Sequence, residues 1–192
     1  LSFAIFPDGQ TWTESVELLP ASDHIYPEPD AAWSFTNTDC CVVYYVTGTS
    51  GERDLMDILE VANAQAISAA QLMGTDFNDP IPLVLLPRVL GHGGFAGLEI
   101  YITYMDRNYA GSSLTQVLHH EMVHILDGRL GGDMRPSLFV EGLAVYLSGG
   151  HFKPEPLMSR VATLLDLGWY LPLTPLADDF YHAQHEIGYM EG

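Results

Sequence analysis

Basic residues are scarce in this sequence. Only 7 of the 192 residues are Lys or Arg, against 25 Asp and Glu, and the formal net charge is -18 at pH 7. A protein that binds DNA or RNA neutralises phosphates with clusters of basic side chains, and the sequence contains no such cluster. The composition therefore excludes nucleic acid as a partner.

Long hydrophobic runs are also lacking. Proline or glycine interrupts the longest uncharged stretches, and none approaches the roughly 20 apolar residues that a membrane-spanning helix needs. We therefore expect no membrane span. The chain starts at Leu1 without a basic stretch followed by an apolar core, so we interpret it as a mature or excised fragment. Its acidic composition favours a secreted or otherwise extracytoplasmic location.

Cysteine is rare. The two cysteines, Cys40 and Cys41, are neighbours in an apolar stretch. Adjacent side chains on a strand point to opposite faces, and neighbouring cysteines cannot join distant segments of the chain. Free cysteine is among the residues most often buried. We therefore expect two small, buried cysteines that are not bonded to each other.

The N-terminal part of the chain differs from the rest. Residues 1–38 are rich in turn-forming residues and lack sustained periodicity, which predicts an irregular or short-stranded N-terminal segment. Residues 39–192 are expected to form the main domain. Three short apolar runs predict strands, and the glycine-rich stretch before the last of them predicts an ordinary loop. The strands are expected at residues 41–47, 81–86 and 99–104.

Four segments have the residue spacing of amphipathic helices. The first ends at Gly74, a residue type that commonly terminates helices. The second opens with a capping box formed by Ser113 and Gln116 and ends at Gly128. Ser137 is the expected N-cap of the third. The four helices are expected at residues 51–73, 112–127, 137–148 and 157–167.

The second of these helices contains the motif His120-Glu121-Met122-Val123-His124. Residues four apart lie on one helix face, so both imidazoles can bind one metal ion. Zinc accepts such neutral imidazoles, and the Glu beside the first histidine projects toward a zinc-bound water, where it can act as a general base. The preceding His119 points away and is expected to be exposed or to support the ligands. The alternative interpretation is a pair of surface histidines on an amphipathic helix.

A second motif follows on the next expected helix. It reads Glu-Gly-Leu-Ala-Val-Tyr from Glu141, and sixteen residues separate His124 from Glu141. A catalytic zinc site has three protein ligands and an open position for water, and a carboxylate from a neighbouring helix can be the third ligand. The metzincin pattern does not fit, because its third histidine would fall at Leu130. We therefore expect one Zn²⁺ ion bound by His120, His124 and Glu141.

The two motifs together resemble those of the gluzincin metallopeptidases, and the segment from Glu141 resembles the third-ligand segment of peptidase MA-like domains. The resemblance implies an α+β, zincin-like fold over residues 39–192. This fold has a small mixed sheet with a backing helix, an active-site helix and a helical C-terminal lobe, which we expect to be only partly present. The resemblance also implies that His120, His124 and Glu141 are the zinc ligands and Glu121 is the general base.

Gluzincins usually stabilise the oxyanion of the tetrahedral intermediate with a Tyr or His that follows the third ligand. The candidates here are Tyr181, His182, His185 and Tyr189, and the resemblance to peptidase MA-like domains favours Tyr189. The strand expected at residues 99–104 resembles the edge strand on which zincins bind peptide substrates by main-chain hydrogen bonds.

The expected function is zinc-dependent hydrolysis of a peptide or protein substrate. Glu121 would take a proton from the zinc-bound water and pass it to the leaving amine. The alternative is a non-catalytic zinc-binding module of a larger secreted or surface protein, in which the metal contributes only stability. The sequence distinguishes neither endopeptidase from aminopeptidase nor one oligomeric state from another.

Overall fold

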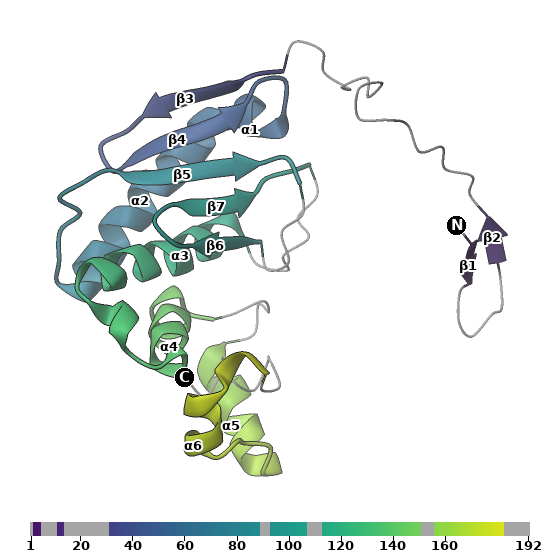
Figure 1. The fold of residues 1–192 in the computed structure, drawn as a ribbon, viewed down its shortest axis with the longest axis vertical. Coiled ribbons are helices and arrows are strands. Elements are labelled where there is room, and N and C mark those ends of the chain that lie inside the picture. The colour runs from purple at the N-terminus through teal and green to yellow at the C-terminus, as the bar shows by residue number, and fades with distance from the viewer. Residues whose placement is uncertain are drawn as a thin grey trace. The chain divides into compact units, whose positions relative to one another are not determined.

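A computed structural model describes six stretches of the chain, which fall in two compact units, Leu1–Asp30 and Ala31–Gly192. In the first unit, strands β1 (Ser2–Ala4) and β2 (Thr11–Thr13) pair antiparallel. Among the described residues, the second unit contains the larger sheet and every helix (Figure 1). The described stretches are residues 2–4, 11–13, 31–88, 93–106, 113–150 and 156–182.

The second unit is built on a five-stranded mixed sheet with the strand order β3-β4-β5-β7-β6. Strands β4, β5 and β7 run parallel at its centre, while β3 and β6 are antiparallel to their neighbours. The three central strands confirm the three predicted strands, because a run that is apolar on both faces is typical of a buried parallel strand. The bounds are β3 (Trp33–Asn37), β4 (Cys41–Val46), β5 (Ile81–Leu86), β6 (Gly94–Ala96) and β7 (Ile100–Thr103).

Strand β7 is not the edge of the sheet, so that part of the prediction is wrong. The chain turns between Ala96 and Ile100, where the Gly97 N–H donates a hydrogen bond to the Glu99 carbonyl at 3.0 Å. This turn places β6 antiparallel against the outer side of β7. The edge strand beside the motif helix is therefore the short β6, in the stretch where the sequence predicts a loop.

Helices cover one face of the sheet (Figure 1). The predicted helix 51–73 is interrupted at Asp54, which separates the short α1 (Ser50–Arg53) from α2 (Leu55–Met73). The Asp54 side chain pairs with Arg53 and accepts a hydrogen bond from the hydroxyl of Tyr104, the residue that follows β7. Helix α3 (Leu114–Arg129) packs beside α2 and beneath β6 and β7.

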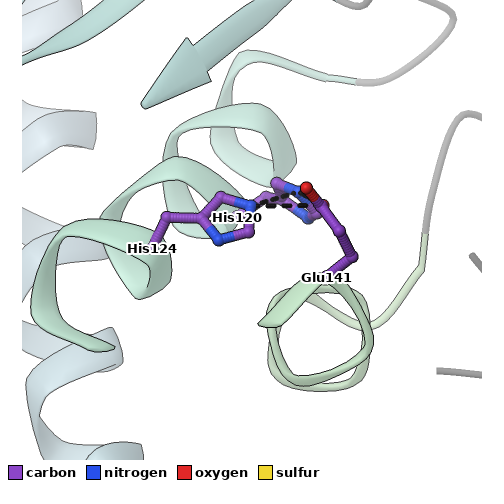
Figure 2. Close-up of side chains that lie close together, drawn as sticks. All are labelled: His120, His124 and Glu141. Carbon is purple, nitrogen blue, oxygen red and sulfur yellow. Dashed lines mark hydrogen bonds and ion pairs between the residues drawn. The ribbon is translucent and has the colours of Figure 1, made fainter. Parts of the chain in front are cut away.

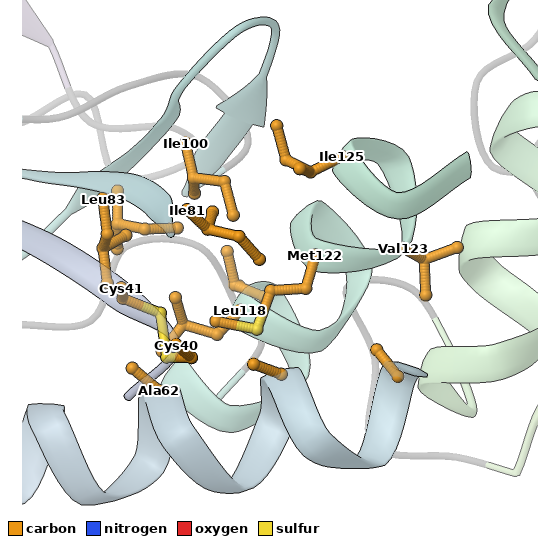
Figure 3. Close-up of a cluster of buried hydrophobic side chains, with 14 of the residues drawn as sticks. Cys40, Cys41, Ala62, Ile81, Leu83, Ile100, Leu118, Met122, Val123 and Ile125 are labelled. Atoms are coloured by element: carbon orange, nitrogen blue, oxygen red, sulfur yellow. A yellow bond between two sulfur atoms is a disulfide. The ribbon is translucent and has the colours of Figure 1, made fainter. Parts of the chain in front are cut away.

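The core lies between the sheet and helices α2 and α3 (Figure 3). From α3, Leu118 and Met122 are completely buried beside Ile81 and Ile100 of the central strands. Small side chains such as Ala62 line the facing side of α2, which allows the two helices to approach closely. This packing fixes the rotation of α3 about its axis and therefore the direction of its remaining side chains.

Cys40 and Cys41 form a disulfide bond, so the prediction of unbonded cysteines is wrong (Figure 3). Cys40 lies in a bend before β4 begins at Cys41, so the alternation of a strand does not apply to the pair. Thr38 stabilises the bend, because its hydroxyl accepts a hydrogen bond from the Cys41 N–H at 3.0 Å. Both cysteines are buried. The bond links neighbours and therefore joins no distant segments.

The helices after the sheet complete an α+β fold. The predicted helices 137–148 and 157–167 are confirmed, although Ser137 is the first helical residue and Pro136 is the N-cap. Within the described parts of the chain, no helix combines the length and apolar character that crossing a bilayer requires. The elements are η2 (Gly132–Met134), α4 (Ser137–Ser148), α5 (Leu157–Leu167), α6 (Leu173–Asp178) and η3 (Phe180–His182).

Candidate metal centre

Helix α3 carries both histidines of the motif on the side that faces α4 (Figure 2). The helix begins as predicted, because the Ser113 hydroxyl accepts a hydrogen bond from the Gln116 N–H at 3.2 Å. Since Leu118 and Met122 point into the core, His120 and His124 point toward the neighbouring helix. Their Nε2 atoms lie 3.1 Å apart, which is the convergence expected for residues four apart on one helix face.

Helix α4 brings Glu141 to these two nitrogens. Its Oε2 atom lies 3.5 Å from Nε2 of His120 and 3.3 Å from Nε2 of His124. The three side chains are largely buried, with 11%, 15% and 12% of their surfaces exposed. Helices α3 and α4, with η2 in the connection between them, thus place two imidazoles and one carboxylate around a single point (Figure 2).

The spacing of these three atoms fits a tetrahedral zinc ion. Zinc binds histidine nitrogen and carboxylate oxygen at about 2.0–2.1 Å, so two ligand atoms of a regular tetrahedron lie about 3.3–3.4 Å apart. The three separations of 3.1, 3.3 and 3.5 Å cluster around this value. The donor set of two nitrogens and one oxygen is also one that zinc accepts. The group His120, His124 and Glu141 can therefore hold a metal ion.

The electrostatics of the three groups favour binding of a cation. Burial raises the pKa of Glu141, but hydrogen bonds to His120 and His124 outweigh burial and hold that pKa well below its usual range. Burial lowers the pKa of His120 and keeps its imidazole neutral. Burial also lowers the pKa of His124, but the bond to Glu141 and the surrounding carboxylates prevail and raise it. The site therefore holds an ionised carboxylate, and a proton on His124 competes with a metal ion.

Glu121 lies next to this group and remains outside the ligand set. Only 6% of the residue is exposed, and its carboxylate accepts a hydrogen bond from the backbone N–H of Ala96 in β6. Burial is the main cause that raises the pKa of Glu121 to about 7, and the nearby Glu141 adds to the effect. A carboxyl group with a pKa near neutrality is suited to exchange protons at physiological pH.

Among the four predicted oxyanion candidates, the structure places Tyr181 at the site. Its hydroxyl, in η3, donates a hydrogen bond to Oε1 of Glu141 at 3.1 Å. Partial burial and the charge of Glu141 raise the pKa of Tyr181, which keeps the phenol protonated. His182 is exposed and pairs with Asp179. His185 and Tyr189 lie outside the described residues.

Two polar residues of α3, His119 and Asp127, are buried, and the sequence does not predict their partners. His119 is 6% exposed, so the exposed alternative is wrong, and its Nδ1 atom lies 2.9 Å from Oε1 of Gln65 on α2. Asp127 is 4% exposed and forms an ion pair with Arg135 in the turn before α4. Both partners are distant in sequence or lie in an irregular turn, where no periodic pattern signals them.

Comparisons with protein-family models, with curated proteins and with solved structures find no match to this chain. The assignment of the site therefore rests on its own geometry. Three donor atoms at tetrahedral spacing, a second buried carboxyl group and a tyrosine hydroxyl gather between α3, α4 and β6. Such a combination can bind a cation and transfer a proton beside it.

Proposed function

We propose that this protein is a zinc-dependent hydrolase of peptide bonds, a metallopeptidase of the gluzincin type. The observation that carries the proposal is that three side chains can bind the metal while a fourth, which is not a ligand, can transfer a proton. His120, His124 and Glu141 have the spacing of zinc ligands, while Glu121 is buried beside them with a pKa of about 7. The resemblance of the two helix motifs to gluzincins supports the same assignment.

Each residue of the chain has a distinct role in the proposed reaction. A zinc ion held by the three ligands would supply a Lewis acid that polarises the peptide carbonyl and lowers the pKa of a water molecule. Glu121 accepts a proton from the attacking water and donates it to the leaving amine. The Ala96 N–H holds the Glu121 carboxylate in place. Tyr181 and Tyr189 are the candidates for stabilising the oxyanion, and Tyr181 lies beside Glu141.

The number of ligands favours catalysis over a purely structural metal. Structural zinc sites almost always have four protein ligands, whereas catalytic sites have three and leave one position open. Within the described residues, the group contains three ligands. A purely structural site also has no need for a buried carboxyl group that does not bind the metal, because burial of that group costs free energy. The non-catalytic zinc-binding module remains the second candidate function.

Metal content and peptide cleavage together test the proposal. We expect one zinc per chain by elemental analysis and cleavage of an unbiased peptide mixture by the wild-type protein. Glu121→Gln keeps the side-chain shape but removes the base, so it should retain zinc while cleavage falls about 10²–10⁴-fold. His124→Ala removes a ligand, so it should lose stoichiometric zinc and cleavage together.

Different outcomes contradict different parts of the proposal. Equal cleavage rates for the wild type and Glu121→Gln would disprove the role of Glu121. Stoichiometric zinc in His124→Ala would disprove the ligand assignment. Zinc binding without cleavage by the wild type would instead support the non-catalytic module.

A further inference from the structure

The face of α3 that carries the two histidines continues by one more turn. His120, His124 and Asp127 occupy positions i, i+4 and i+7, so their side chains form one stripe along the helix, toward α4. The first two members of the stripe are candidate metal ligands, and the third is a buried carboxylate that lies too far along the helix to join them. A buried carboxylate requires a partner, because leaving its charge unpaired strongly destabilises the folded protein.

Arg135 is that partner, and it ties Asp127 to the turn between the two ligand helices. Its Nη2 atom donates a hydrogen bond to Oδ1 of Asp127. Its Nε atom donates to the carbonyl oxygen of Gly132 at 3.3 Å, and its backbone N–H donates to the same oxygen at 3.0 Å. The guanidinium group therefore joins Asp127 at the end of α3 to the carbonyl oxygen of Gly132 in the turn.

The backbone of the turn packs directly against this ion pair. Gly132 is buried, and a Cβ atom at this position would collide with the Asp127 carboxylate and with the Arg135 guanidinium group. Only glycine leaves room for the chain to pass so close to the two charged groups. Within the described residues, Oδ2 of Asp127 has no hydrogen-bond partner, so the pairing depends on the bond to Arg135.

The position of this ion pair along the chain connects it to the third metal ligand. Arg135 lies two residues before α4 begins at Ser137, and Glu141 is the fifth residue of that helix. A shift at the start of α4 therefore moves Glu141 relative to the histidines of α3. Metal sites tolerate ligand distances that deviate by only about 0.2 Å, so a small displacement of α4 weakens binding.

We propose that the Asp127–Arg135 ion pair is a positioning device that sets α4, and with it Glu141, at the distance that metal binding requires. The inference rests on the proposed metal site, although neither Asp127 nor Arg135 belongs to the group of three candidate ligands. With 44% of its side chain exposed, Arg135 can be shortened without leaving a cavity in the core. Its removal therefore acts on the turn rather than on the packing of the sheet.

A double-mutant cycle on zinc affinity tests the inference. The dissociation constant is measured by competition with a chromophoric chelator for wild type, Arg135→Ala, Glu141→Ala and the double variant. We expect Arg135→Ala to bind zinc about 10- to 100-fold more weakly, the range for residues that orient metal ligands. If Arg135 acts through Glu141, the double variant binds zinc no more weakly than Glu141→Ala alone.

Two further variants separate positioning from general stability. Arg129→Ala removes another arginine at the end of α3, one that binds the carbonyl oxygens of Asp79 and Pro80 instead of the turn, and should leave zinc affinity unchanged. Arg135→Lys keeps the positive charge and should recover part of the affinity, which also provides a folded protein if Arg135→Ala does not fold. The free energy of unfolding without metal is measured for each variant.

The outcomes distinguish this inference from the proposed function. A wild-type protein that does not bind zinc overturns both. If the wild type binds zinc and Arg135→Ala or Arg135→Lys binds it equally well, the positioning role is wrong and the metal site stands. Fully additive losses in the double variant would also overturn the inference, because they would show that Arg135 does not act through Glu141.

Discussion

Glu121 is a single residue whose surroundings change its chemistry. The carboxyl group lies between α3 and β6 and is almost completely buried. Burial penalises the charged form, which raises the pKa of Glu121 to about 7. The raised pKa suits Glu121 to proton transfer. It also means that ionisation of Glu121 makes the metal-free protein less stable.

The metal-free protein should therefore show a pH-dependent difference between wild type and Glu121→Gln. In the unfolded chain the pKa of Glu121 is near 4.5, and in the folded protein it is about 7, so the folded state binds the proton more tightly. The stability that this proton contributes is fully present below about pH 4.5 and is lost as the pH rises through 7. A pKa rise of this size corresponds to about 3 kcal/mol.

Urea unfolding in the presence of a chelator measures this difference. Near pH 8 the variant should be more stable than the wild type, by up to about 3 kcal/mol, because glutamine avoids the cost of a buried charge. The difference should shrink toward zero near pH 4.5. A difference that is constant with pH would show that the Glu121 carboxyl group is not perturbed by burial.

Among the secondary-structure elements, β6 packs so closely against its neighbours that glycine is needed at position 94. A Cβ atom on Gly94 would lie 2.7 Å from Cδ1 of Ile102 and 2.9 Å from the carbonyl oxygen of Tyr101. It would also lie 3.1 Å from Cγ1 of Val117 on α3. The missing side chain therefore allows β6 to pack against both β7 and the motif helix, which brings the Ala96 N–H to Glu121.

Replacing Gly94 with Ala should destabilise the protein by about 1–3 kcal/mol, the usual cost of an added methyl group in a packed region. Urea unfolding checks this value. Gly97→Ala is the matched control, because it lies in the adjoining turn and a Cβ there would meet no atom within 4 Å. Equal stability of the two variants would mean that β6 does not pack as closely as the structure shows.

The sequence predicts best those elements that have a clear pattern of apolar residues. Short apolar runs and helical periodicity indicate the central strands and helices, and the spacing of His120 and His124 already places two candidate ligands on one face. The edge strand β6 has only three residues, too few for a periodic signal. The Cys40–Cys41 bond and the Asp127–Arg135 ion pair depend on bends and turns, whose geometry follows from tertiary packing rather than from a local pattern.

For the molecule as a whole, metal binding and folding stability are linked. A ligand that binds only the folded state stabilises it by RT ln(1 + [L]/Kd), about 2.7 kcal/mol at a free concentration 100-fold above Kd. For a chain of 192 residues this corresponds to a rise in Tm of about 5–10 °C. We expect this rise on adding zinc to the wild type after chelation. Thermal unfolding of His124→Ala should show no such rise, and an equal rise would place zinc elsewhere.

The three candidate ligands lie close together in the sequence as well as in space. His124 and Glu141 are separated by sixteen residues that form the end of α3, one turn and the start of α4. Closing so short a loop costs only about 2–3 kcal/mol of chain entropy, whereas the parallel pairing of β4, β5 and β7 joins segments across long crossovers and is slow to form. The helical hairpin of α3 and α4 can therefore bring its ligands together before the sheet is complete. A metal ion present during folding would bind and stabilise that hairpin early.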